Sequence, residues 1–292
     1  MSDRESTSNP TGARVSVVIV NWRAPEETLA AVDSLRAQSC PLHRIYVVDN
    51  GSGDGSLEQL EAVLAAQPDV VVLANADNLG FGGGCNRALV QAVEDGSNFV
   101  WLLNNDARAA PHCLQALLDA ALGDPAVGMV GSWLNDPDDP AHDHSGSWMR
   151  PWLMSCGAVR TSADLDSHPY SWVTAASVLI RTDVLVLTGV FDESFFMYWE
   201  DADLAMRIRA AGYRIAIAPG ALVAHSAGTS SVDIPVQRYL WHYRSQALWL
   251  RKHHSRPEAA LVLLRLKFLS KALLDRDFAR FAALRNVHLP AR

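Results

Sequence analysis

The chain has 292 residues, 49% of which are hydrophobic, and a formal net charge of −7, which describes a globular protein with enough apolar residues for a full core. Four widely separated cysteines exclude closely spaced zinc or redox motifs and predict reduced thiols in a cytosolic protein. Basic residues interrupt the longest apolar region, which argues against a membrane-spanning helix, and the acidic balance of the first 234 residues argues against nucleic-acid binding.

The first 13 residues are polar and lack the apolar run of a secretory signal. We expect them to form a disordered leader before the folded part of the chain. The folded domain is expected to cover residues 14–234, followed by a separate basic region at residues 235–292.

The first third of the chain alternates between predicted strands and helices. Residues 16–20 form an apolar, β-branched run typical of a strand covered on both faces, and residues 26–38 have the apolar spacing of a helix. The pattern then continues along the chain, with strands at 45–48, 70–73 and 99–103 and helices at 57–66 and 85–94. This order predicts an α/β fold with a mostly parallel sheet, helices on both faces, and a ligand site at the carboxyl ends of the strands.

Residues 135–170 interrupt this regular order. They follow a helix expected to begin near Pro111 and a strand at 127–130, and they have no periodicity and many Asp, His, Pro and Ser residues. A loop this long inside a compact domain is usually functional or disordered, and its tryptophans Trp148 and Trp152 favour a functional loop. Regular structure is expected again at residues 172–180.

Polar residues follow the first two predicted strands. Asn21 can contact a nucleotide or simply cap the next helix. Asp49 begins a turn-rich segment, so it can accept hydrogen bonds from a base or ribose, or stabilise the turn alone.

A glycine-rich loop follows the third strand, at residues 75–86. A dinucleotide-binding fingerprint would need its glycines after the first strand of the unit, so that interpretation is disfavoured. Glycines such as Gly80 instead allow the backbone to approach a phosphate or sugar at a helix N-terminus, with side-chain contacts from Asn78 and Asn86.

The triplet Asn104-Asn105-Asp106 follows the fourth predicted strand directly. Carboxylate and amide oxygens at the end of a strand are suitable ligands for a hard divalent cation. The triplet therefore predicts a metal site at the edge of the sheet.

Two adjacent acids, Glu200 and Asp201, follow the apolar residues 195–199. Acids are common in the first turn of a helix, and residues 203–211 followed by Gly212 predict a helix there. The apolar segment before them instead predicts a cleft wall, where burial raises the pKa of a carboxylate into the working range of a general base.

Five segments in this order resemble the family-2 glycosyltransferases of the GT-A fold, especially their bacterial rhamnosyltransferase-like branch. They are residues 17–21, 47–56, 78–89, 104–106 and 199–204, and the similarity covers about residues 14–250. The resemblance implies transfer of a sugar, with inversion, from a nucleoside-diphosphate donor. It suggests dTDP-L-rhamnose as the donor and a glycan or lipid-linked glycan of bacterial surface polysaccharide as the acceptor.

The resemblance also implies how the donor is held. Asp106 corresponds to the last acid of the DXD motif, which binds Mg²⁺ or Mn²⁺ together with the diphosphate, while Asn104 stands where the first Asp usually is. Asn105 then contacts the donor, as Asn104 does. His225 is either a further metal ligand or a structural residue, and Arg244 either reaches the diphosphate or packs in the core.

For the chemical step, the resemblance implies that Asp201 is the base and that Glu200 orients the acceptor, with Trp199 beside it. With a glycan acceptor, the loop at residues 135–170 is expected on the acceptor side, where Trp148 and Trp152 offer flat faces to sugar rings. Three alternatives stay open: a UDP-sugar donor on the same fold, a non-catalytic nucleotide- or carbohydrate-binding module, and a nicotinamide-dependent oxidoreductase. The Glu200–Asp201 pair counts against the module, and the position of the glycines counts against the oxidoreductase.

The C-terminal region has a different charge from the rest of the chain. It holds twelve Lys and Arg against three Asp and Glu, a formal charge of +9, which leaves −16 for the first 234 residues. Residues 258–284 mix apolar and basic residues as membrane-surface helices do, although a helix packed on the domain or on a partner subunit has the same composition. We therefore expect a cytoplasmic protein, with peripheral contact at the inner face of the plasma membrane as one interpretation of this region.

Overall fold

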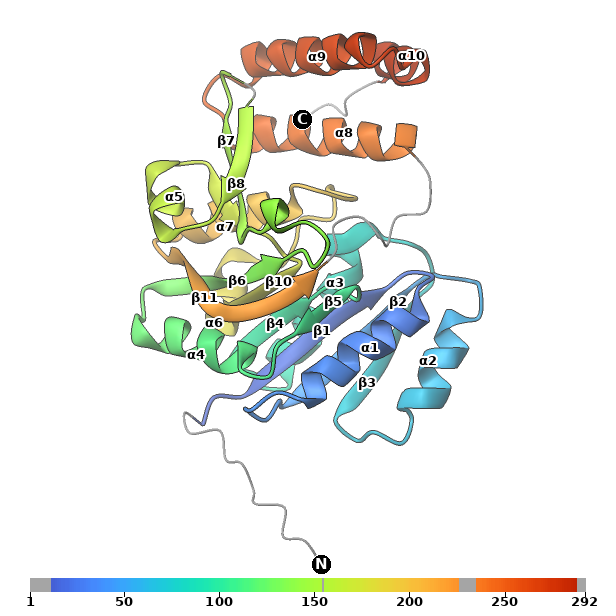
Figure 1. Ribbon diagram of the computed structural model, residues 1–292, viewed down its shortest axis with the longest axis vertical. Helices are drawn as coiled ribbons and strands as arrows, with labels where there is room; N and C mark the ends of the chain where they lie inside the picture. The colour runs from blue at the N-terminus through green and yellow to red at the C-terminus, as the bar shows by residue number, and fades with distance from the viewer. Residues whose placement is uncertain (1–11, 154, 226–234, 288–292) are drawn as a thin grey trace, which may run out of the picture.

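A computed structural model of the protein describes residues 12–153, 155–225 and 235–287 (Figure 1). Apart from Gly12 and Ala13, the expected leader lies outside the described residues. The expected boundary at residue 234 also lies outside them and stays a prediction.

The core of the fold is an eight-stranded sheet with the order β3-β2-β1-β4-β10-β6-β11-β5. Its strands are β1 (Val15–Asn21), β2 (Arg44–Asn50), β3 (Val70–Asn75), β4 (Phe99–Leu103), β5 (Ala107–Ala109), β6 (Val127–Asn135), β10 (Ser177–Arg181) and β11 (Arg214–His225). The four strands from β1 to β4 pair in parallel, as do β6 and β11, whereas β10 and β5 are antiparallel to their neighbours. The predicted mostly parallel sheet is confirmed.

Helices cover both faces of this sheet (Figure 1). The helices α1 (Pro25–Arg36), α2 (Ser56–Leu64) and α4 (Cys113–Gly123) pack against one apolar cluster, which includes Val17 and Ile19 of β1. The helices α3 (Gly80–Glu94), α6 (Thr182–Thr188) and α7 (Glu200–Ala210) pack against the other, which includes Val18. Successive strand residues point to opposite faces, so a continuous apolar strand supplies both layers.

Residues 146–173 form a second, antiparallel sheet with the order β8-β7-β9. It consists of β7 (Gly146–Arg150), β8 (Ser155–Val159) and β9 (Ser171–Val173), and η1 (Pro140–His142) and α5 (Ser162–Ser167) lie in the connecting segments. The expectation of a loop without regular structure is wrong for this part of residues 135–170. The strands are short and contain residues of low β-propensity, such as Gly146 and Gly157, whose missing Cβ atoms leave room for the backbone of Trp172 and the ring of Trp148, respectively.

Three C-terminal helices complete the fold, as predicted. They are α8 (Pro235–His253), α9 (Pro257–Leu274) and α10 (Phe278–Asn286), and they lie beyond the second sheet with α9 and α10 outermost (Figure 1). Aromatic contacts join them to the rest of the protein, because Trp249 of α8 packs on Tyr170 and Trp199. None of the described helices combines the length and apolarity needed to cross a bilayer.

Candidate active site

The parallel strands of the large sheet end at one edge, and a cavity of about 680 Å³ lies there. The register pairs Asn21 with Asp49 and Asn50 with Asn75, so the ends of β1, β2 and β3 lie at the same level. The cavity also has walls from the second sheet and from the C-terminal helices α8 and α9. Nine residues predicted from the sequence line it, namely Asn78, Gly80, Asn104, Asn105, Asp106, Trp199, Glu200, Asp201 and His225.

Asp106 and His225 are neighbours although they are far apart in the sequence. The short strand β5 pairs with the end of β11 and places His225 opposite Ala107. The Oδ1 atom of Asp106 is therefore 3.2 Å from Nε2 of His225, and the amide nitrogen of Asn104 is 3.4 Å from the same imidazole nitrogen. Strand pairing thus builds a compact group of one carboxylate, one imidazole and one amide.

This group fits a divalent cation that also needs ligands from a substrate. Two ligand atoms about 2.1 Å from one octahedral ion, at right angles, are about 3.0 Å apart, close to the Asp106–His225 separation. Within the residues that the structure describes, no three His, Cys, Asp or Glu side chains form a closed metal site. An ion with so few protein ligands takes phosphate oxygens and water for its remaining positions.

Asp201 lies in the first turn of α7, where backbone amides fix its carboxylate. Its Oδ1 accepts a hydrogen bond from the amide of Ala202 at 2.8 Å, and its Oδ2 accepts one from the amide of Ala175 at 3.3 Å. The preceding residues Tyr198 and Trp199 have φ angles of +68° and +70°. Two consecutive non-glycine residues in this region are rare, and such backbone strain is often found at functional sites.

Burial makes Asp201 and Glu200 weaker acids than usual. It raises the pKa of Asp201 to about 6, and hydrogen bonds from the amides of Ala202 and Ala175 oppose the rise. Burial and then the charge of Asp201 raise the pKa of Glu200 well above its ordinary value. Near neutral pH, therefore, Asp201 is the member of the pair that loses its proton and can accept another.

Asn21 and Asp49 do not line the cavity. Asn21 donates a hydrogen bond from its amide nitrogen to Asp49 at 2.7 Å, and the amide of Ser52 donates to Asp49 at 3.1 Å, so the two side chains form a buried network. Their sequence neighbours Trp22 and Asn50 face the cavity instead. A contact of Asn21 or Asp49 with a base or ribose stays a prediction.

Asn86 holds two protein segments together. Its amide nitrogen donates to the carbonyl of Phe191 at 3.0 Å and to Glu193 at 2.9 Å, and its oxygen accepts from the amide of Phe191 at 3.0 Å. Asn86 does not line the cavity, and these three hydrogen bonds use its side chain within the protein. It ties α3 to the segment that leads to the Glu200–Asp201 pair.

Gly80 allows α3 to begin against the backbone of the segment before α7. Its φ is +76°, and a Cβ at this position would lie 1.8 Å from the carbonyl oxygen of Phe196. The next amide, of Phe81, donates to that same carbonyl at 3.0 Å. The sequence predicted that the backbone approaches a phosphate or sugar at this glycine, and that contact stays a prediction. The structure shows a close approach to the protein's own backbone at Phe196.

We expect Gly80→Ala to lower the free energy of unfolding by more than about 3 kcal/mol, because the added methyl group meets a fixed backbone oxygen. Gly53→Ala is the matched control, since Gly53 has a φ of +63° and nothing within 4 Å of its added Cβ. Gly53→Ala should lower the free energy of unfolding by only about 1–2 kcal/mol, the cost of placing alanine in the left-handed conformation. Urea unfolding measures both, and equal losses would show that the contact with Phe196 does not matter.

Neither Trp148 of β7 nor Trp152, in the turn after β7, lines the cavity. Trp148 stacks on His168 at 4.3 Å, and Ser147, its neighbour on β7, faces the cavity because successive strand residues alternate. Trp152 is half exposed and contacts the ring of His254. Their predicted contact with sugar rings is not supported by this placement.

Two basic side chains that the sequence did not identify line the cavity, Arg238 of α8 and Lys267 of α9. Arg244, the predicted diphosphate ligand, is exposed and does not line the cavity. Lys267 is partly buried between apolar residues of α9, and the sequence pattern alone suggested a solvent-facing basic residue. The packing of α9 on α8 turns it toward the site.

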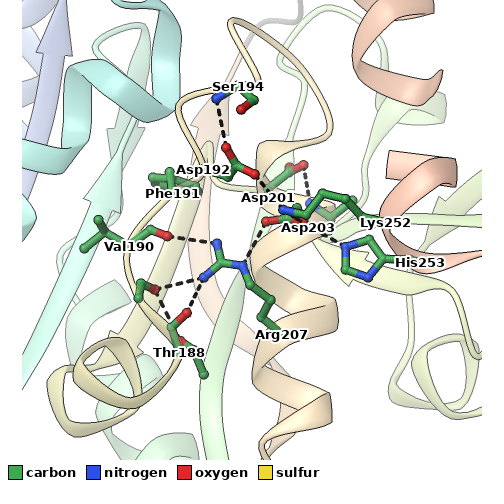
Figure 2. Close-up of polar contacts among 12 residues, drawn as sticks. Thr188, Val190, Phe191, Asp192, Ser194, Asp201, Asp203, Arg207, Lys252 and His253 are labelled. Atoms are coloured by element: carbon green, nitrogen blue, oxygen red, sulfur yellow. Dashed lines mark hydrogen bonds and ion pairs between the residues drawn. The ribbon is translucent and has the colours of Figure 1, made fainter. Parts of the chain in front are cut away.

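A buried ionic network anchors the helix that carries Asp201 (Figure 2). Asp203 is fully buried and contacts Lys252 at 2.6 Å, His253 at 2.8 Å and Arg207 at 2.8 Å. Arg207 donates further hydrogen bonds to the carbonyls of Thr188, Gly189 and Val190. The network therefore connects α7, α8 and the segment after α6.

The charge of Asp203 is favoured by these partners. Burial alone would raise its pKa, but the hydrogen bonds from His253 and Lys252 and the charge of Arg207 outweigh burial and lower it to about 2. A pKa lowered in the folded state stabilises the protein fully above about pH 4. This stability is lost as the pH falls toward 2.

We expect Asp203→Asn to destabilise the protein by about 3–5 kcal/mol, because the partly buried Arg207 loses its counter-charge and Lys252 keeps only its ion pair with Asp192 at 2.7 Å. Asp275→Asn is the control, since Asp275 pairs with Lys271 at 3.3 Å on the exposed surface of α9. Exposed pairs contribute about 0–1 kcal/mol. If chemical denaturation gives the same loss for both variants, the network has no special role in holding α7 on α8.

Two family models match the chain. The one described as glycosyl transferase family 2 matches residues 16–181, and the one described as glycosyl transferase family group 2 matches residues 99–284. The first covers more than half of the sequence and includes the glycine-rich loop and Asp106. The second includes Asp201 and His225.

Curated relatives and solved structures agree with these matches. N-acetylglucosaminyl-diphospho-decaprenol L-rhamnosyltransferase of Mycobacterium tuberculosis is 30% identical to this chain and covers 72% of it and 75% of its own length. Galactofuranosyltransferase GlfT1 of the same species is 27% identical over 74% of this chain and 71% of its own length. A mannosyltransferase from Pyrobaculum calidifontis, solved with GDP-Man and Mn²⁺, has the same fold, with a TM-score of 0.61 at 18% identity over 95% of this chain and 82% of that chain. The chain therefore belongs to glycosyl transferase family 2 and is an inverting glycosyltransferase of the GT-A fold.

Proposed function

We propose that the protein transfers a sugar from a nucleoside-diphosphate donor, with L-rhamnose from dTDP-L-rhamnose as the first candidate, to a lipid-linked glycan of a bacterial surface polysaccharide. The observation that carries the proposal is the convergence of Asp106, His225 and Asp201 on one cavity. These groups supply the two functions of the reaction, support for a leaving diphosphate and removal of a proton from the acceptor.

In the proposed reaction, Asp201 accepts the proton of an acceptor hydroxyl while that oxygen attacks the anomeric carbon. The bond from the anomeric carbon to the diphosphate breaks as the new bond forms, which inverts the anomeric centre. Backbone amides hold the Asp201 carboxylate in place and leave its charge available. Glu200, whose Oε2 is buried without a hydrogen-bond partner among the described residues, is placed to bind an acceptor hydroxyl.

On the donor side, we propose that Asp106 and His225 hold Mg²⁺ or Mn²⁺, with Asn104 and Asn105 beside the diphosphate. When bound, the cation stabilises the negative charge that develops on the leaving phosphate oxygens. Asn104 carries no charge, so the protein supplies one carboxylate where a DXD motif supplies two. Mn²⁺ in the related mannosyltransferase structure supports this assignment.

The identities of donor and acceptor rest on the relatives. The rhamnosyltransferase is named for an acceptor in which a diphosphate links the sugar to decaprenol, which supports a lipid-linked acceptor here. The galactofuranosyltransferase relative supports the alternative of a sugar other than rhamnose, and a UDP-sugar stays the alternative donor. On the acceptor side, we propose that Trp199 and the inner face of the second sheet contact the glycan, in place of Trp148 and Trp152.

We also propose that the protein is cytoplasmic and associates peripherally with the inner face of the plasma membrane through residues 235–292. A lipid-linked acceptor would make such an association useful. The basic C-terminal helices offer the positive charge that anionic lipids attract.

A thermal-shift screen of nucleoside diphosphates, with and without Mn²⁺, tests the proposed donor site. A ligand that binds only the folded protein raises its unfolding temperature. We expect a clear shift with dTDP plus Mn²⁺ and a smaller one with dTDP alone. A larger shift with UDP would favour the alternative donor, and no shift with any nucleoside diphosphate would contradict the proposed function.

A further inference from the structure

The helix α9 has two apolar faces, and one of them points to solvent. Its inner face packs on the protein through Leu261, Leu264 and Phe268. Its outer face carries five large apolar side chains that are 37% to 83% exposed, which we call the α9 stripe: Val262, Leu263, Leu266, Leu273 and Leu274. At 100° per residue these positions lie within about a third of the helix circumference, so they share one face, which the exposed Ser270 interrupts.

Basic side chains border the α9 stripe on both sides. Arg265 lies along one border, and Lys267 and Lys271 lie along the other. Residues 256–287 contain seven Lys and Arg and three Asp and Glu, a formal charge of +4, and Lys271 pairs with Asp275 as Arg280 does with Asp277. An apolar surface with cationic borders is complementary to the surface of an anionic bilayer.

The same charges argue against a second copy of the chain as the occupant. Two copies that met through this surface would bring like charges together, and like charges repel. Phe278, the first residue of α10, is also exposed, and α10 lies with α9 in the outer layer of the molecule (Figure 1). A bilayer can accept all of these side chains at once.

One residue links the α9 stripe to the catalytic cavity. Lys267 follows Leu266 directly, so the two side chains are about 100° apart around the helix. Leu266 faces solvent, whereas Lys267 lines the cavity together with Arg238 of α8. A lipid lying along the stripe would therefore place its phosphate on the side of the cavity where these two cations lie.

We propose that the α9 stripe docks on an anionic lipid bilayer, so that a membrane-anchored acceptor presents its phosphate to Lys267 and Arg238. The part about the acceptor rests on the proposed function. Docking itself depends on the stripe and its basic borders alone.

Vesicle flotation of the full chain tests docking. The vesicles contain either phosphatidylcholine alone or equal parts of phosphatidylcholine and phosphatidylglycerol. We expect the wild type to float with the anionic vesicles, and Leu266→Glu/Leu273→Glu to bind them at least about tenfold more weakly. Val186→Glu/Leu187→Glu is the matched control, because these α6 side chains are 70% and 63% exposed and lie outside the stripe, so it should float like the wild type.

Flotation of the stripe variant equal to that of the wild type would overturn the proposal, and so would a wild type that binds neither kind of vesicle. Sedimentation analysis adds a second readout. A wild-type dimer that the stripe substitutions convert to a monomer, without any vesicle binding, would assign the stripe to contact between copies of the chain.

Transfer assays separate this inference from the proposed function. With a short-chain, water-soluble acceptor that carries a diphosphate, the stripe variant should keep wild-type turnover, and with the same acceptor embedded in anionic vesicles it should lose most of it. Lys267→Gln should raise the KM for the diphosphate acceptor at least about tenfold and leave the KM for the donor unchanged. An unchanged acceptor KM would overturn the role of Lys267. Vesicle binding by a protein that transfers no sugar to either acceptor would contradict the proposed function and leave docking intact.

Discussion

The Asp201→Asn variant should fold and bind the donor but transfer sugar about 10²–10⁴ times more slowly than the wild type, a loss typical of a missing general base. At about 1.4 kcal/mol per factor of ten, this is roughly 3–5 kcal/mol in the barrier. Asparagine is close in size to aspartate and still offers an oxygen to the amides of Ala202 and Ala175. The loss should therefore appear in kcat and leave the KM for the donor nearly unchanged.

The pH dependence gives an independent check on Asp201. Its raised pKa of about 6 means that the carboxylate is protonated below that pH and cannot accept a proton there. Wild-type kcat should therefore fall about tenfold per pH unit below about 6 and level off above it. If kcat does not fall below about pH 6, Asp201 is not the base. The same holds if Asp201→Asn keeps more than about a tenth of wild-type turnover.

The Asp106→Ala variant should lose the dependence of turnover on Mn²⁺, together with at least about 10²–10³-fold of the rate, because a bound cation contributes several kcal/mol to stabilising the leaving charge. His225→Ala should produce a smaller loss that high Mn²⁺ concentrations partly restore. Turnover measured over a range of Mn²⁺ concentrations distinguishes these outcomes. Full activity of Asp106→Ala without added metal would mean that the Asp106–His225 pair is structural.

Asn104→Asp is the informative partner of this variant, because it adds the carboxylate that the DXD pattern usually has. The added charge would lie beside His225, whose Nε2 is 3.4 Å from the Asn104 amide. Half-saturation should then occur at a lower Mn²⁺ concentration. An unchanged metal requirement would place the cation away from this triplet.

The sequence predicted the large sheet because local composition and long-range packing agree there. Val17, Val18 and Ile19 are β-branched and apolar, and each is buried in one of the two layers. The carboxyl ends of parallel strands meet at one edge, so the polar triplet at 104–106 had to lie near the ends of β1 and β2. Residues 104–106 accordingly line the cavity at this edge of the sheet.

The second sheet could not be predicted in the same way. Its strands hold glycine and serine at positions such as Gly146, Ser147 and Gly157. The ring of Trp148 packs over Gly157, and the backbone of Trp172 comes close to Gly146. Tertiary packing decides such strands, and local pattern does not. The same packing explains why Trp148 points away from the cavity.

Side-chain direction limited the prediction of individual residues. Asn21 and Asp49 are buried and hydrogen-bond to each other. The next residue along the chain in each case, Trp22 and Asn50, lines the cavity instead. The contact of His225 with Asp106 depends on pairing between β5 and β11, and the inward position of Lys267 depends on how α9 packs. No short sequence pattern specifies contacts over such separations.

The central claim is that Asp106 supports binding of the donor diphosphate and Asp201 removes the acceptor proton in the same cavity. Calorimetric titration of dTDP with Mn²⁺ tests it most directly, with the wild type, Asp106→Ala and Asp201→Asn compared. Wild type and Asp201→Asn should bind dTDP with similar affinity, and Asp106→Ala should bind at least about tenfold more weakly, at the level that the wild type shows without metal. Weak binding by Asp201→Asn with normal binding by Asp106→Ala would reverse the two roles and contradict the account.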